Sequence, residues 1–183
     1  MTDTVLLNQI ASAVAASDQH GLESALFQLG SVVLRRGEYD TGTLKAALQV
    51  LTTDAARAWE PSWLLWKHFD DNWEYLSTDA REHVRVAAER EFGRSEHWMW
   101  SFMIGVLFAE CFTDGGALDA LERFVESSDD QARAVLPDAL RNLARRTTDT
   151  RLKARARARV QSLENDRSPH VRAEARAALA RWK

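Results

Sequence analysis

Residues 166–182 read DRSPHVRAEARAALARW and carry the clearest structural signal in the chain. Ser168 fits a helix N-cap, and Pro169 follows at the first helical position, where its fixed φ and missing N–H cost nothing. Apolar side chains then recur three and four residues apart, which places them on one helical face. These side chains are Val171, Ala175, Ala178, Leu179 and Trp182. The stretch therefore predicts an amphipathic helix.

A fainter copy of this pattern lies 39 residues upstream. Ala132-Arg133 and Ala139-Leu140 correspond to Val171-Arg172 and Ala178-Leu179. The run of aspartate, proline, Val-Arg, alanines and leucine resembles the second helix of a HEAT repeat, whose helix pairs recur with a period near 40 residues. This resemblance implies an all-α, right-handed, solenoid-like stack of antiparallel helix pairs, with about eight to ten helices. It also implies that Asp166 and Arg172 belong to an Asp–Arg ladder between neighbouring repeats.

Helical periodicity continues through the rest of the chain, and no alternating strand pattern interrupts it. The second helix has Leu22, Leu26, Leu29, Val33 and Leu34 inward and ends at Arg35-Arg36-Gly37, a C-terminal signal. Thr78 or Asp79 is expected to cap a helix that continues to Phe92, and Pro137 to kink or split another. The expected helical ranges are 3–17, 22–36, 41–51, 54–59, 78–92, 95–112, 118–126, 130–146, 149–164 and 169–182, together with 61–76 if that segment is one helix.

Length and composition indicate one soluble domain. The 183 residues are 45% apolar and 28% charged, with eight glycines and three prolines, which disfavours disorder and an all-β fold. The single cysteine, Cys111, excludes an internal disulfide and is expected to be buried. The N-terminus lacks the basic region of a signal peptide. The longest apolar run, residues 98–109, is shorter than the roughly 20 residues of a membrane span. We therefore expect a cytoplasmic protein.

The net charge of −3 conceals a strong asymmetry along the chain. Residues 1–132 hold 22 Asp and Glu against 10 Lys and Arg, whereas residues 133–183 hold 5 against 14. Such a division creates surfaces of opposite potential on a nearly neutral protein.

Tryptophans concentrate in the acidic part of the chain. Six of the seven lie between Trp59 and Trp100. Core packing explains such a cluster, but aromatic anchors among acids are also typical of a binding surface for a basic protein. If residues 61–76 form one helix, Trp63 lies off the main apolar stripe and faces solvent. The predicted partner-binding residues are Trp63, Trp66, Asp70, Asp71, Trp73, Glu74, Asp79 and Glu82.

The basic C-terminal part offers a different surface. Arg151, Arg155 and Arg159 lie on one flank of the helix over 149–164, beside the apolar stripe. These arginines can remain solvated, pair within the molecule, or join Arg172 and Arg176 in a groove that binds a partner or nucleic acid.

No motif predicts catalysis, a metal or a cofactor. The pairs Glu82-His83 and Glu96-His97 have the reverse order of the His-Glu ligands in HEAT-like di-iron enzymes, and neighbouring helical residues diverge by about 100°. We therefore expect a non-enzymatic protein-binding module. It resembles the small immunity proteins that neutralise bacterial toxins by occlusion. Two alternatives remain: a HEAT-like nucleic-acid-binding or DNA base-modifying protein using the basic helices, and a small-ligand binder whose aromatic cluster lines a pocket.

Overall fold

A computed structural model describes residues 3–111 and 115–182, without the side chains of Trp98, Ala109, Glu110, Cys111 and Ala120. The expected burial of the Cys111 thiol and the expected helix end at Phe112 therefore lie outside the described part. Within it the fold is all-α, as predicted, with eleven α-helices and two 3-10 turns. In chain order these are α1 (Thr4–Ala16), α2 (Gln19–Arg36), α3 (Thr41–Leu51), α4 (Asp54–Ala58), η1 (Glu60–Ser62), α5 (Trp63–Asp71), η2 (Trp73–Tyr75), α6 (Thr78–Glu91), α7 (Trp98–Cys111), α8 (Gly115–Glu122), α9 (Asp130–Arg146), α10 (Thr150–Leu163) and α11 (Pro169–Ala180).

Local sequence chemistry explains where most helices begin and end. The carboxylates of Asp18 and Asp40 accept hydrogen bonds from the backbone N–H groups of Gly21 and Thr43, which caps α2 and α3. Gly37 ends α2 with φ +72°, a left-handed conformation that glycine adopts without a Cβ penalty. The cap of α6 is Ser77 rather than Thr78 or Asp79, because its hydroxyl oxygen accepts from the N–H of Ala80.

By its internal contacts the chain divides into two compact units, residues 1–100 and 101–183. The division falls within α7 and does not coincide with the change of charge near residue 132.

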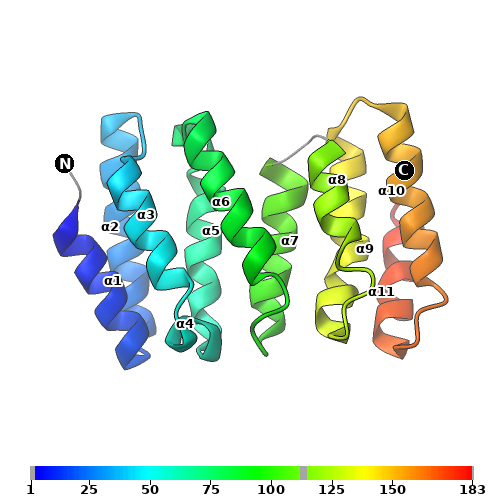
Figure 1. Cartoon of the computed structure of the whole chain (residues 1–183), viewed down its shortest axis with the longest axis horizontal. Helices are drawn as coiled ribbons and strands as arrows, with labels where there is room; N and C mark the ends of the chain where they lie inside the picture. Colours follow the sequence, from blue (N-terminus) through cyan, green and yellow to red (C-terminus); the bar gives the residue numbers. More distant parts are fainter. Residues whose placement is uncertain (1–2, 112–114, 183) are drawn as a thin grey trace. The chain divides into compact units, whose positions relative to one another are not determined.

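The first unit has two layers of helices. α2 packs against α1 and α5, and α3 packs against α1 and α6. Figure 1 shows α3 and α6 in front of α2 and α5. Tyr39 lies in the segment between α2 and α3, and Tyr75 lies in the segment between α5 and α6. The N–H of Tyr39 donates a hydrogen bond of 2.8 Å to the carbonyl of Tyr75, which joins these two segments. Leu22, Leu44, Leu65 and other apolar side chains form the core between the layers.

The second unit has the same kind of pairing. α9 packs against α8, α10 and α11, and α10 also contacts α11. Figure 1 shows α8 and α10 in front of α9 and α11. α9 matches the predicted range and is not divided at Pro137, whose side chain is buried. α8 begins and ends earlier than predicted, at Gly115 and Glu122.

The predicted C-terminal helix forms as α11, with Ser168 at the N-cap position and Pro169 at its first turn. The Ser168 hydroxyl does not cap its own helix but donates to Asp130 at the start of α9, over 3.0 Å. Asp166 binds Arg133 of α9 through two hydrogen bonds of 2.9 and 3.1 Å. These polar contacts fix the start of α11 against the start of α9.

Candidate functional site

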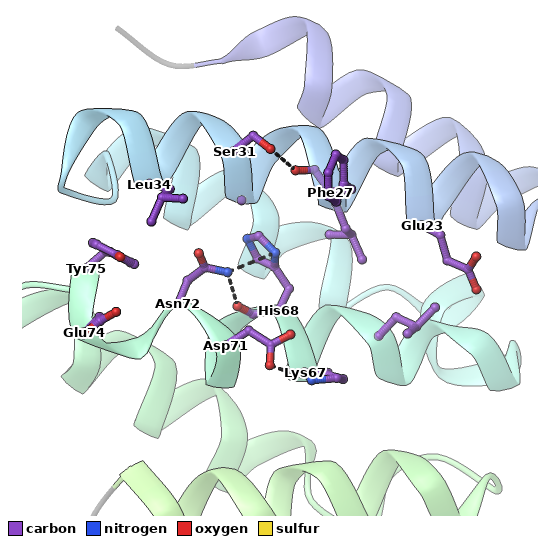
Figure 2. A pocket seen from close by; sticks show the side chains of 13 residues that line it. Glu23, Phe27, Ser31, Leu34, Lys67, His68, Asp71, Asn72, Glu74 and Tyr75 are labelled. Carbon is purple, nitrogen blue, oxygen red and sulfur yellow. Dashed lines mark hydrogen bonds and ion pairs between the residues drawn. The ribbon is translucent and has the colours of Figure 1, made fainter.

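A groove of about 550 Å³ lies between α2 and α5 in the first unit. Figure 2 shows Phe27, Ser31 and Leu34 on α2 opposite His68 and Asn72, with Glu23 towards one end and Tyr75 towards the other. α2 and α5 are in contact with each other, so the walls of the groove belong to packed elements. The lining residues are Glu23, Leu26, Phe27, Gly30, Ser31, Leu34, Leu64, Lys67, His68, Asp71, Asn72, Glu74 and Tyr75.

Two apolar side chains on α2 are turned out of the core into this groove. Phe27 is 77% exposed and Leu34 is 63% exposed. A separation of seven residues places both on nearly the same side of the helix. The core side of α2 is already occupied by Leu22, Leu29 and other buried residues, so the expectation that Leu34 faces inward is wrong. Large exposed apolar side chains that gather at one place are typical of interaction sites.

The floor of the groove is polar but uncharged. Burial lowers the pKa of His68 to about 4, so its imidazole is neutral at physiological pH. His68 Nε2 lies 3.2 Å from the hydroxyl of Tyr39, and Nδ1 lies 3.4 Å from the amide nitrogen of Asn72. The Asn72 amide also donates to the backbone carbonyl of His68 over 2.8 Å. Because Tyr39, His68 and Asn72 satisfy one another's hydrogen-bonding groups, they hold the floor of the groove in one arrangement.

The rim of the groove is acidic. Glu23, Asp71 and Glu74 line it together with a single lysine, Lys67, which gives a formal charge of −2. Lys67 Nζ lies 2.5 Å from Asp71 Oδ1, an exposed pair four residues apart on α5. Glu23 accepts a hydrogen bond from the Gln19 amide over 2.8 Å. The surroundings of Phe27 and Leu34 therefore attract cationic groups.

The predicted tryptophan surface is only partly accessible. Trp66 is fully buried and packs edge-on against Trp100, with 5.6 Å between ring centroids, so its assignment as a partner-binding residue is wrong. Trp66 lies on the buried side of α5 together with Leu65 and Phe69. The helix considered over 61–76 is also interrupted, because α5 ends at Asp71 and a separate 3-10 turn follows. Trp63 and Trp73 are half-buried and do not line the groove, and the Arg81 guanidinium lies 5.5 Å from the Trp73 ring centroid. Trp63 is thus less exposed than expected.

The predicted acids are divided between two places. Asp71 and Glu74 line the α2–α5 groove, whereas Asp70 does not. Asp79 and Glu82 are on α6, where Glu82 is hydrogen-bonded to Arg85 over 2.7 Å. Sequence reasoning missed Glu23, Phe27 and Tyr75. The signal for Phe27 was available, because it falls outside the buried stripe of α2.

Part of the predicted basic surface is neutralised within the molecule. Arg155 lies 2.8 Å from Asp119 and is hydrogen-bonded to Glu122, which raises its pKa, and Arg159 Nε is 3.5 Å from Glu122. Arg172 donates to the backbone carbonyl of Asp166 over 2.8 Å. Arg151 and Arg176 are exposed. The five predicted arginines therefore do not form one free cationic surface.

The described side chains include no group of three or more His, Cys, Asp or Glu residues placed to hold a metal ion. None of the helices within residues 3–111 and 115–182 is long and apolar enough to cross a membrane. Comparisons with protein-family models, with curated proteins and with solved structures returned no match. Function is therefore inferred from the residues of this chain alone.

Proposed function

We propose that the α2–α5 groove binds another protein, and that the chain acts as a non-enzymatic binding module. The observation that carries this proposal is the exposure of Phe27 and Leu34 on one side of α2 in an acid-rimmed groove. The matching partner segment presents an apolar side chain to these two residues and basic side chains to Glu23 and Glu74.

The expected affinity follows from the two anchors. Full burial of a Phe or Leu side chain contributes about 1.5–3 kcal/mol each. The partner's own apolar surface adds to this, while lost freedom of motion and ordered side chains oppose it. The acidic rim contributes mainly to the association rate and to the choice of a basic partner.

A HEAT-like scaffold is part of this proposal. It is supported by the helix pairs within each unit and by a hydrogen bond repeated 39 residues apart. Arg133 donates to the carbonyl of Ser127, and Arg172 donates to the carbonyl of Asp166, in each case six residues back. Equivalent arginines thus make equivalent contacts in successive helix pairs, as expected of a structural repeat.

Under the immunity-type function expected from the sequence, the partner is a toxin or enzyme. That partner has a basic surface near its active site. The acidic rim favours such a partner, because opposite potentials speed association and exclude acidic competitors. Fold alone does not establish this function.

The proposal is tested by affinity capture from the native host with quantitative mass spectrometry. The double variant Phe27→Asp/Leu34→Asp should retain less than a tenth of the partner that the wild-type chain retains. The control Val5→Asp/Val86→Asp changes two other exposed apolar residues, which lie outside the groove, and should retain the partner.

Charge is tested in the same assay with Glu23→Lys/Glu74→Lys against Glu38→Lys/Glu60→Lys, a control that alters exposed acids outside the groove. Only the groove pair should weaken capture, and more strongly at low salt than at high salt. Equal capture by both groove variants and the wild-type chain would refute the proposed site.

A further inference from the structure

A second concave site lies in the second unit and shares no lining residue with the proposed protein-binding groove. It is a cleft of about 680 Å³ formed by α9, α10 and the residues that end and follow α11. This volume is in the range of small-molecule and cofactor sites. Its lining residues are Arg141, Ala144, Arg145, Lys153, Ala180, Arg181 and Trp182.

The cleft is strongly cationic. Four of its lining side chains are basic and none is acidic. Arg141 and Arg181 share one carboxylate outside the lining, Asp138 Oδ1, at 3.0 and 3.5 Å. Arg145 and Lys153 form no ion pair within the part of the chain that the structure describes. One acid therefore offsets four cations, and the uncompensated charge faces the cleft.

A comparison along α10 shows that this excess of charge is local. Arg155 and Arg159 are neutralised by Asp119 and Glu122. Lys153 is two residues from Arg155, about 200° around the helix, and lines the cleft instead. Arg155 and Arg159 thus have acidic partners within the molecule, whereas Lys153 on the other flank has none among the described residues.

The cleft also contains an aromatic ring. Trp182 is half-buried and lines the same cavity as the cations. Arginine forks bind phosphate oxygens in a bidentate manner, and an indole face stacks on a nucleobase. A carboxylate-bearing peptide would use the cations but would leave the ring without a matching group.

We propose that this cleft binds a phosphorylated nucleoside, with its phosphates at Arg145 and Lys153 and its base against Trp182. The ligand is a free nucleotide or one nucleotide unit of a single strand, since both present the same chemistry. This site is independent of the protein-binding groove, so either can fail without the other.

The test uses the full chain and measures binding of ATP, tripolyphosphate, a fluorescein-labelled ten-residue oligothymidylate and a labelled ten-residue oligoglutamate. ATP or the oligothymidylate should bind at least tenfold more tightly than oligoglutamate. Trp182→Leu should weaken ATP or oligothymidylate binding about thirtyfold, the middle of the range for one stacked base, and leave tripolyphosphate binding unchanged.

Charge is tested with Arg145→Gln/Lys153→Gln against Arg151→Gln/Arg176→Gln, which removes two exposed cations elsewhere in the second unit. Circular dichroism verifies folding of each variant. The cleft variant should lose at least tenfold in affinity, and its salt slope for the oligothymidylate should fall by about 0.7 for each lost phosphate contact. Tight ATP binding identifies a free nucleotide, and binding of the strand alone identifies a nucleic acid.

Three results would overturn the proposal. They are no binding of either nucleotide probe, equal losses in the cleft and control variants, and oligoglutamate binding as tight as oligothymidylate binding. The last would identify an acidic peptide as the ligand instead.

Discussion

Asp166→Ala should strongly destabilise the second unit, because it leaves a buried arginine without its counter-charge. The Arg133 side chain is 3% exposed and the Asp166 side chain 9% exposed. Arg133 Nε lies 2.9 Å from Asp166 Oδ2, and Nη2 lies 3.1 Å from Oδ1. Asp166 Oδ1 also accepts from the backbone N–H of Ser168 over 2.7 Å. The substitution removes all three hydrogen bonds.

The expected loss of unfolding free energy is about 4 kcal/mol, since removing one partner of a buried ion pair costs about 3–5 kcal/mol. A typical domain is stable by about 5–15 kcal/mol, so this loss is large. Removing both charges with Arg133→Met/Asp166→Ala should cost less than the sum of the single changes, by about 2 kcal/mol. The hydrogen bonds from Arg133 lower the pKa of the Asp166 carboxyl. Its contribution is therefore present above the carboxyl's ordinary pKa near 4 and is lost as pH falls through the lower, folded-state value.

The assay is urea unfolding followed by circular dichroism, with amide hydrogen exchange to locate the effect in α9 and α11. Arg172→Met is the matched control, because Arg172 is half-buried and its hydrogen bonds are to backbone carbonyls. Its cost should be about 1 kcal/mol. A loss below 1 kcal/mol for Asp166→Ala, or equal losses for the two variants, would refute the reasoning.

Three further predictions concern the first unit. Because burial lowers the pKa of His68 to about 4, the unfolded state binds its proton first as pH falls below about 6.5; stability should fall by about 2 kcal/mol between pH 8 and 5, and His68→Gln should remove that part in urea titrations. Trp100→Phe should cost about 1 kcal/mol more in unfolding free energy than Trp66→Phe, because Trp100 Nε1 donates to the Glu91 carbonyl over 3.0 Å whereas Trp66 Nε1 makes no hydrogen bond in the described residues; equal costs would contradict this. Glu91→Gln should cost about 3 kcal/mol in thermal or urea unfolding, because the fully buried Glu91 lies 2.6 Å from Arg57; a neutral result would contradict the importance of that pair.

Helix ends were predictable where the signal is local. Gly37 ends α2 because glycine adopts the left-handed conformation without a steric penalty. Pro169 begins α11 because its missing N–H has no partner to lose in the first turn of a helix. α9 likewise has the predicted limits, Asp130 and Arg146. The pairing of Arg133 with Asp166 involves residues 33 positions apart, and the resemblance to a repeat indicated a ladder at Asp166 and Arg172 without naming Arg133 as the partner.

The candidate site was less predictable because it depends on contacts between distant segments. The placement of the side chains in 61–76 was considered for one continuous helix, but Asn72 follows α5 and its amide binds the His68 carbonyl. This break leaves Asp71 and Glu74 beside α2, which periodicity within 61–76 cannot show. The periodicity of α2 is enough to assign Phe27 to the outer side of that helix. The residues that face Phe27 across the groove depend on where α5 packs, which this periodicity does not show.

The most direct test of the proposed binding groove is photo-crosslinking in the native host with p-benzoylphenylalanine at Phe27. The same probe at Val5, an exposed apolar position outside the groove, is the control. We expect a discrete crosslink from Phe27 to a protein segment with basic side chains, and its loss when Glu23 and Glu74 are changed to lysine. The same products from Phe27 and Val5, or no product from Phe27, would contradict the central claim.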